Sequence, residues 1–269
     1  VRYANRAANF ASVSARIAAI AIARASYNLS GLRPGINSAD INSYNFYDAQ
    51  GRVVGQVDGE GYLTETVYDT RDHITQSIRY ANKAGAISSA STLASIRPAL
   101  NASQDQKTIQ SWDNAGQLIS RTNAEGTLTQ FSYNSVGQLV QTVTAAGTAD
   151  ERTNRARYDI QGRLIGELDG RGADAVALND PLALWAANGT THAYDASGRR
   201  TSTTDANGHR TLFFYDPIGR LRYTVNALGE VTESKYNALG QLHEQIVYGT
   251  RVDVLTLGAT TPGGLNTAT

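Results

Sequence analysis

The sequence predicts an all-β protein: a repetitive antiparallel β-hairpin ribbon winding into a curved sheet, with short helical insertions. Two observations support this prediction. Short runs of alternating apolar and polar residues recur along the chain, separated by tight-turn residues. In addition, Tyr194, Tyr215 and Tyr236 follow one another at equal intervals, and self-similarity at a fixed period of this kind indicates a repeat architecture.

Each repeat contains two turns and two strands. It begins Tyr-Asp-x-x-Gly-Arg-Leu, continues with Asp/Asn-x-x-Gly and a Thr, and ends at the next Tyr. Asp or Asn at the first position of a type I turn bonds the backbone ahead, and Gly at the fourth position accepts a positive φ. After Gly219, the residues Leu221, Tyr223 and Val225 alternate with polar residues, which is the period of a β-strand.

The same unit recurs upstream, and its aromatic, Asp and Gly positions are the candidate site residues. They are Tyr47, Asp48, Gly51, Tyr68, Trp112, Asp113, Gly116, Tyr133, Gly137, Tyr158, Asp159, Gly162, Tyr194, Asp195, Gly198, Tyr215, Asp216, Gly219, Tyr236 and Gly240. Their strict period favours a structural role, as ladders of side chains across adjacent strands. One unit departs: after Tyr68-Asp69, Asp72 stands where the pattern leads us to expect Gly one place earlier or later.

This unit resembles the YD repeat of the Rhs family, which includes bacterial Rhs proteins, the shell-forming subunits of insecticidal toxin complexes and the teneurin extracellular barrel. The resemblance covers most of residues 44–248. In such relatives the ribbon spirals into a hollow shell. The resemblance therefore implies a non-catalytic wall module of a large secreted or cell-surface bacterial protein that encloses or delivers a C-terminal toxin.

A second function hypothesis is an extracellular adhesin or a self-assembling fibre or tube. A larger period of a few hairpins followed by an excursion favours it, because a closed shell also needs caps and plugs that differ from its wall. The repeated Tyr residues are candidates for stacking against carbohydrate. The expected partners are the rest of the same long polypeptide, a toxin cargo, neighbouring copies in an assembly, or carbohydrate.

We expect residues 1–269 to form one continuous repeat array, because repeat arrays lack internal domain boundaries. The hairpins occupy 44–79, 109–172 and 191–248, and the excursions occupy 1–43, 80–108, 173–190 and 249–269. The sequence contains no Met, so we expect the chain to be a slice of a longer protein.

The excursions contain the predicted helices. Residues 12–25 have apolar side chains near helical spacing, and residues 91–96 form a second short helix that Pro98 ends. The apolar cluster 181–185 is expected to dock on the sheet. These segments should cover one face, because a lone hairpin ribbon needs such cover for stability.

Composition argues against several classes of protein. The chain has 24 basic and 24 acidic residues, and the sequence shows no basic stripe that predicts a nucleic-acid partner. It has no Cys, so disulfides and Cys-based zinc sites do not form. The most apolar run, residues 17–25, is too short to span a bilayer.

We expect no catalytic site, metal site or cofactor. Asp58 and Glu60 lie close together in one turn, but calcium needs six to eight oxygen ligands and turn capping explains the Asp. The four His residues lack metal-ligand spacing, and a cross-strand or solvated role is expected for them. Asp216-Pro217 resembles the Asp-Pro of the self-cleaving region of Rhs proteins, yet repeats continue beyond it, so we interpret it as an ordinary turn.

Overall fold

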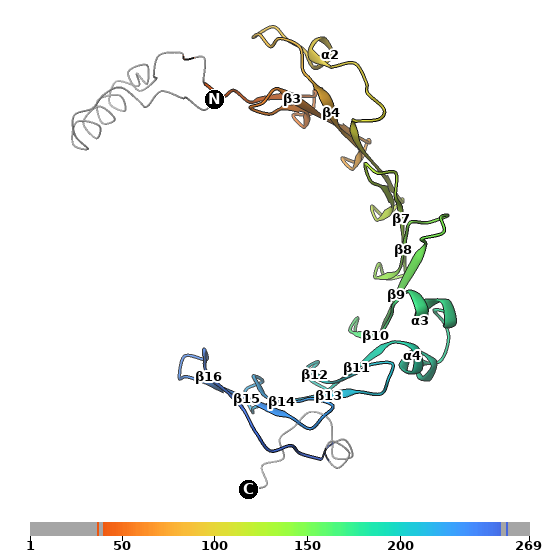
Figure 1. The fold of residues 1–269 in the computed structure, drawn as a ribbon, viewed down its shortest axis with the longest axis vertical. Coiled ribbons are helices and arrows are strands. Elements are labelled where there is room, and N and C mark those ends of the chain that lie inside the picture. The colour runs from red at the N-terminus through yellow and green to blue at the C-terminus, as the bar shows by residue number, and fades with distance from the viewer. Residues whose placement is uncertain (1–36, 38–39, 254–256, 258–269) are drawn as a thin grey trace, which may run out of the picture. The chain divides into compact units, whose positions relative to one another are not determined.

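The computed structural model describes residues 37, 40–253 and 257 of the 269-residue chain. The helix predicted at 12–25 and most of the excursion predicted at 249–269 lie outside the described residues. The chain divides into two compact units, residues 1–126 and residues 127–269, and each unit is described separately below (Figure 1).

In its described residues, unit 1 is a six-stranded antiparallel sheet with one short helix. Its strands pair in chain order, so each strand forms a hairpin with the next. The elements are β1 (Tyr44–Tyr47), β2 (Val53–Val57), β3 (Tyr62–Tyr68), β4 (Ile74–Lys83), α2 (Leu93–Ile96), β5 (Gln106–Trp112) and β6 (Leu118–Thr122).

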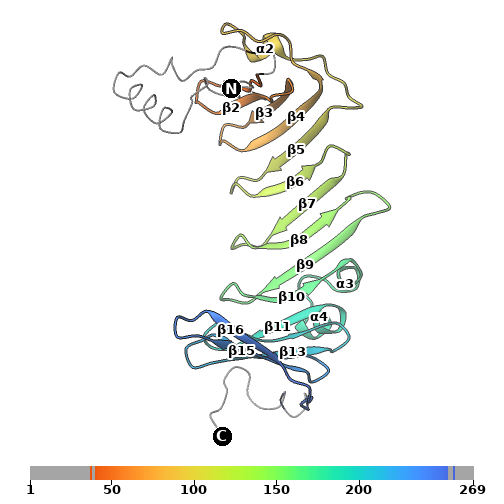
Figure 2. The same ribbon diagram turned by 60° about the vertical axis from the view of Figure 1, so that its left-hand side comes forward.

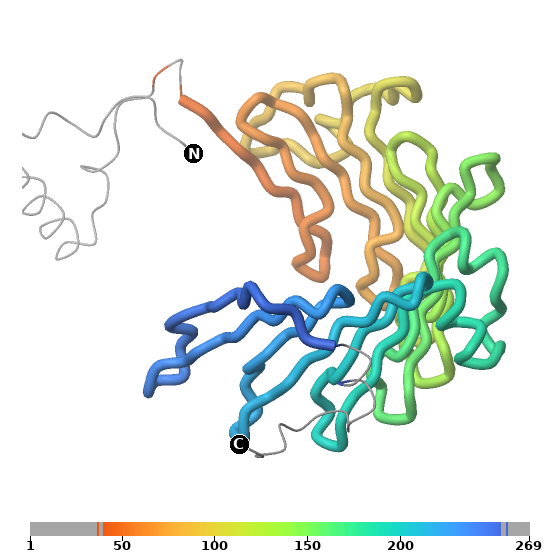
Figure 3. Tube along the Cα trace, turned by 60° about the horizontal axis from the view of Figure 1, so that its bottom comes forward, coloured from red at the N-terminus to blue at the C-terminus, as the bar shows by residue number. Residues whose placement is uncertain are grey.

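Among the described residues, unit 2 repeats this architecture with ten strands and two helices. Figure 3 shows its chain, green to blue, running back and forth from one hairpin to the next. Its strands also pair antiparallel in chain order. The elements are β7 (Leu128–Tyr133), β8 (Leu139–Thr144), β9 (Arg152–Tyr158), β10 (Leu164–Leu168), α3 (Gly170–Ala175), α4 (Leu182–Asn188), β11 (Thr190–Tyr194), β12 (Arg200–Thr204), β13 (Arg210–Tyr215), β14 (Leu221–Val225), β15 (Val231–Tyr236) and β16 (Leu242–Val247). The predicted all-β class, with antiparallel hairpins and short helical insertions, is confirmed.

The two ends of the strands differ in the kind of connection that they carry. At one end every connection is a tight turn that follows Tyr or Trp, and we call this row of turns the tyrosine rim. At the opposite end, which we call the insertion rim, both tight turns and longer segments connect the strands. Residues 84–105 in unit 1 and 169–189 in unit 2 leave the sheet there. Insertions therefore lengthen one rim and leave the other regular.

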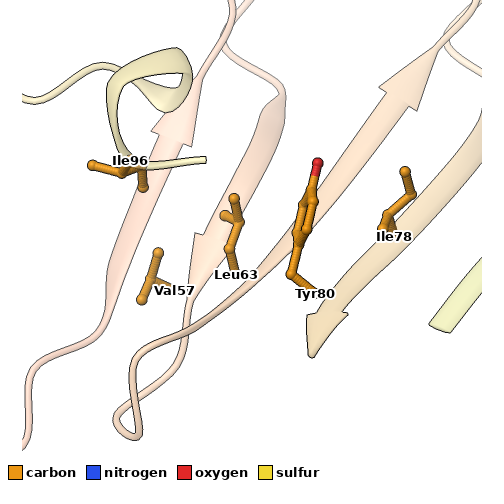
Figure 4. Packing of buried hydrophobic residues seen from close by; sticks show 5 residues of the cluster. All are labelled: Val57, Leu63, Ile78, Tyr80 and Ile96. Atoms are coloured by element: carbon orange, nitrogen blue, oxygen red, sulfur yellow. The ribbon is translucent and has the colours of Figure 1, made fainter. Parts of the chain in front are cut away.

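The core of unit 1 lies where α2 covers β2–β4. Val57, Leu63, Ile78, Tyr80 and Ile96 form a buried cluster, and Ile96 comes from the helix while the other four come from three adjacent strands (Figure 4). The helix begins at a capping box made by Thr92 and Ser95. The strand β4 runs three residues past Tyr80, so the excursion leaves the sheet after Lys83.

The core of unit 2 lies where α3 and α4 pack beside β9–β11 (Figure 2). Leu168, Ala173, Val176 and Trp185 form its buried cluster. The prediction that the apolar segment around Trp185 docks on the sheet is confirmed. No helix in the described part of the chain is long and apolar enough to cross a membrane.

Candidate functional site

The tyrosine rim is built from turns that an Asp side chain holds closed. In the turn at Asp216, the backbone N–H of Asp216 donates to the carbonyl of Arg220 (2.9 Å) and that of Gly219 donates to the carbonyl of Asp216 (2.9 Å). Oδ1 of Asp216 accepts from the N–H groups of Ile218 (3.2 Å) and Arg220 (2.8 Å), and Oδ2 accepts from Nε of Arg220 (2.7 Å). This carboxylate therefore accepts hydrogen bonds from the backbone N–H groups of the turn and also orients the arginine side chain.

The oriented arginine contacts the tyrosine of the next hairpin. The guanidinium of Arg220 lies 4.6 Å from the ring centroid of Tyr236, and the hydroxyl of Tyr236 donates to the carbonyl of Leu221 (2.7 Å). We call this set of contacts the Asp–Arg–Tyr link. Because cation–π and hydrogen-bond contacts act together, each link fastens one hairpin to its successor.

The same link recurs at three further places. Its Arg–Tyr pairs are Arg52–Tyr68 (4.7 Å), Arg163–Tyr194 (4.9 Å) and Arg199–Tyr215 (4.9 Å). The tyrosine hydroxyls donate to the carbonyls of Val53 (3.1 Å), Leu164 (2.7 Å) and Arg200 (2.8 Å).

An insertion does not break the link. Arg163 lies almost twice as far from Tyr194 along the sequence as Arg220 lies from Tyr236, yet the two ring contacts are alike. The extra residues form α3 and α4 at the insertion rim, so the register at the tyrosine rim is unchanged. The link therefore depends on strand pairing and not on sequence distance.

The turn after Tyr68 forms a variant of the link, which corrects the expected departure there. Asp72 occupies the position that Gly holds in the other turns and adopts the left-handed φ of 67°. Oδ2 of Asp69 contacts Nδ1 of His73 (2.9 Å), and the His73 ring stacks on Trp112 with centroids 4.8 Å apart. Nε1 of Trp112 then donates to the carbonyl of Ile74 (2.9 Å). The histidine and tryptophan thus replace the arginine and tyrosine.

Other turns keep the geometry without a charge. The side-chain amide of Asn134 donates to Oε1 of Gln138 (2.7 Å), and that of Asn237 donates to Oε1 of Gln241 (2.9 Å). The hydroxyl of Tyr158 donates to the carbonyl of Leu139 (3.1 Å), as in the charged links. The structure therefore places all of the sequence-predicted positions on the tyrosine rim, with charged links at only some of the turns.

Two glycines that the sequence analysis missed mark where the helices dock. A methyl group on Gly55 would lie 2.5 Å from Cδ1 of Leu93, and one on Gly166 would lie 2.8 Å from Cε3 of Trp185. Each of these glycines is the third residue of its strand. The two stretches read Gly51-Arg52-Val53-Val54-Gly55 and Gly162-Arg163-Leu164-Ile165-Gly166. A glycine inside a strand signals close approach of another group, so this signal was available.

The half-buried Glu65 and the buried Glu233 were also missed. Glu65 accepts from the hydroxyl of Tyr80 (2.8 Å) and pairs with Arg97. Burial and this hydrogen bond raise the pKa of Tyr80 to about 12. Glu233 likewise accepts from the hydroxyl of Tyr248 (2.6 Å), which lowers the pKa of Glu233. In both cases the Glu and Tyr are 15 residues apart, so Tyr80 and Tyr248 hold equivalent positions.

A cavity of about 560 Å³ opens in unit 2 along β8–β11 and the turn at 205–207, with Asn154, Tyr158 and Glu167 in its lining. Beside it, the buried ring of His192 bridges Oε2 of Glu167 and Oγ1 of Thr203, at 3.1 Å each. This hydroxyl–imidazole–carboxylate row crosses three adjacent strands and satisfies the buried ring. No group of three or more metal-ligating side chains gathers among the residues that the structure describes.

Changing Tyr236 to Phe is expected to lower the free energy of unfolding of unit 2 by about 0.5–1.5 kcal/mol, because it deletes the hydroxyl bond to Leu221 and keeps the ring under Arg220. Denaturant unfolding followed by circular dichroism measures the change. Tyr47→Phe is the control, since this tyrosine ends β1, before the first rim turn, and is 59% exposed. Equal effects of the two changes would contradict the link.

The turn carboxylates make stability depend on acid. Burial raises the pKa of Asp195, but the N–H and guanidinium of Arg199 outweigh burial, so the pKa of Asp195 is lowered. The pKa is lowered in the same way at Asp48, Asp58, Asp69, Asp159, Asp205 and Asp216. A lowered folded-state pKa stabilises the fold above the unfolded value, near 3.9, and the contribution is lost as pH falls through the folded value.

The melting temperature is therefore expected to fall as pH drops below about 4. Circular dichroism melts across a pH series measure it. Asp195→Asn should weaken the acid dependence, because asparagine holds the same turn position at 134 and 237 without a titrating group. A melting temperature that is constant down to about pH 2 would contradict a role for these carboxylates.

Fold and rim together define a class of protein: a repeat protein of antiparallel hairpins fastened at one rim. Two segments of the chain carry the repeat of the Rhs (YD-repeat) family. The family model described as RHS Repeat matches residues 112–149 and 194–224. No curated protein matches the chain.

One solved structure shares the fold. A crystal structure of TcdB2-TccC3-Cdc42 is similar over 79% of this chain and 11% of that chain, at 13% identity and a TM-score of 0.55. The Tc holotoxin pore of Photorhabdus luminescens is matched over 78% of this chain and 13% of that one, at 17% identity and a TM-score of 0.43. The chain thus spans about a tenth of the length of these proteins.

Proposed function

We propose that the chain is wall material of a large secreted bacterial Rhs protein, in which the ribbon encloses or delivers a C-terminal toxin. The observation that supports this proposal most is the Asp–Arg–Tyr link. At four places it fastens a hairpin to the next on one rim, and insertions vary on the other. A wall needs such a continuous, register-locked sheet, and a repeat array supplies it from nearest-neighbour contacts.

The chemistry of the repeats supports a structural role over a catalytic one. The titratable groups of the tyrosine rim are occupied within turns and links: Asp216 accepts from Arg220 and from the backbone, and Asp69 contacts His73. These side chains stabilise the turns, and their polar atoms are engaged in hydrogen bonds and ion pairs. The proposed partners are the rest of the same polypeptide and a cargo held by the wall.

Protease protection of a cargo tests the proposal. In a longer polypeptide that carries these repeats and a C-terminal toxin, the toxin should resist added protease. Replacing the link arginines Arg163, Arg199 and Arg220 by glutamine should open the wall and increase cleavage of the toxin. Arg121→Gln, a change at a strand residue outside the links, is the matched control. A toxin that is cleaved equally fast with and without the repeats would contradict enclosure.

The adhesin alternative is favoured by one observation, the cavity of about 560 Å³ lined in part by Tyr158. Stacking of sugars on the rim has less support, because Arg or His covers one face of Tyr68, Tyr194, Tyr215, Tyr236 and Trp112. If the chain binds glycans, Tyr158→Ala should abolish binding on a glycan array while Tyr47→Ala leaves it unchanged.

A further inference from the structure

We propose that the tyrosine rim of unit 2 is a self-association surface that pairs with the same rim of a second copy of this chain about a two-fold axis. The surface consists of one residue from each of the five consecutive turns on this rim, which we call the tip of the turn. In four turns the tip is the residue just before the rim glycine, and in the turn of Gly162 it is the residue two places before it. The tip residues are Val136, Ile160, Ser197, Ile218 and Leu239.

Four of these tips are large aliphatic side chains that project into solvent. Ile160 is 97% exposed, Leu239 83%, Val136 76% and Ile218 75%. They recur once per hairpin, so adjacent tips are two strand spacings apart, about 9.6 Å. Single exposed aliphatic residues are ordinary, but a row of them on one rim marks an interaction surface.

The tips themselves carry no charge that an interface would have to desolvate. The two central residues of each turn are uncharged in all five turns: Ser135, Val136, Ile160, Gln161, Ala196, Ser197, Pro217, Ile218, Ala238 and Leu239. The turn carboxylates point inward, where Asp159, Asp195 and Asp216 bind their arginines. Depletion of charge at the centre is typical of protein interfaces.

The order of the tips favours a second copy over an unrelated partner. Two aliphatic tips, one serine and two aliphatic tips follow one another, so the row reads alike in both directions. A two-fold axis through Ser197 sets Val136 against Leu239 of the second copy, and Ile160 against Ile218. Such self-complementarity defines an isologous contact, and an identical ribbon has the same tip spacing by construction.

The length of the row of tips limits the area that the two copies can bury, and so the affinity of the dimer. Five tips span about 38 Å, and a strip of that length and about 10 Å width buries roughly 400 Å² per copy, half the area per partner of a standard stable interface. The dimer is therefore weak and forms at high concentration. Since the contact is apolar, salt should not weaken it.

Sedimentation velocity of the whole chain tests this association directly. The weight-average sedimentation coefficient should rise between roughly 10 µM and 1 mM protein. The quadruple variant V136S/I160S/I218S/L239S, which repeats the serine found at 197, should remain monomeric. The control L228S/V247S removes two exposed aliphatic residues outside this rim and should still dimerise. A wild-type chain that stays monomeric, or a quadruple variant that still dimerises, would overturn the proposal.

Single cysteines test the two-fold arrangement, because the chain contains no other cysteine. S197C lies on the proposed axis and should form a disulfide dimer several-fold faster than V136C, which lies far from the same position in the second copy. A mixture of V136C and L239C should cross-link faster than either alone. Equal rates for S197C and V136C would overturn the antiparallel pairing. The outcome is independent of the proposed enclosure of a toxin.

Discussion

Replacing Trp185 by alanine is expected to lower the free energy of unfolding of unit 2 by about 3–5 kcal/mol, the largest single effect that the structure predicts. Trp185 is fully buried between α4 and β10, where it fills the space above Gly166, with Arg157 5.8 Å from its ring. Its removal leaves a cavity and frees α3 and α4 from the sheet. Denaturant unfolding measures the loss.

Two matched variants separate the contributions of Trp185. Its indole nitrogen finds no hydrogen-bond partner in the described part of the chain, so Trp185→Phe should cost clearly less than Trp185→Ala, because only volume is lost. Leu184→Ala, on the same helix but half exposed, should cost under about 1 kcal/mol. A Phe variant as unstable as the Ala variant would show that the indole contributes more than packing.

Replacing Leu63 by alanine is expected to destabilise unit 1 by about 2–5 kcal/mol. Leu63 is fully buried in β3 and packs with Val57 and Ile96, so its removal opens the contact between α2 and the sheet. Leu100→Ala is the control, because that side chain is 72% exposed and should cost under about 0.5 kcal/mol.

Hydrogen exchange shows where the Leu63 effect is felt. Stability in repeat proteins is built from local units and their interfaces, so amides of α2 and β2–β4 should exchange faster in Leu63→Ala. Amides of β13–β15 in unit 2 should keep their wild-type rates. Uniformly faster exchange along the chain would mean that the protein unfolds as one cooperative body.

The sequence was sufficient to predict the hairpins because their turns are local. Asp216 and Gly219 close a turn through contacts between near neighbours in the chain. A turn of this kind can therefore be predicted from its own residues. The expected departure after Tyr68 was wrong for the same local reason: Asp72 stands at the glycine position, and Asp tolerates the left-handed conformation better than most residues.

The contacts between hairpins could not be predicted in this way. The sequence shows an arginine after several of the rim glycines, but strand register decides which ring each arginine covers. That ring belongs to the next hairpin, whether it follows closely, as Tyr236 follows Arg220, or after two helices, as Tyr194 follows Arg163. Helix docking is equally non-local. From the sequence alone, Gly166 is only a residue that disfavours a strand. Its role becomes clear from the structure, where Trp185 of a separate helix packs on it.

If the linked hairpins form a wall around a cargo, as we propose, the intact protein should be hollow. Electron microscopy of a longer polypeptide that contains this chain, at low resolution, tests this most directly. Closed hollow particles are expected. Extended tubes or fibres would contradict enclosure and would make assembly or adhesion the leading explanation of the repeats.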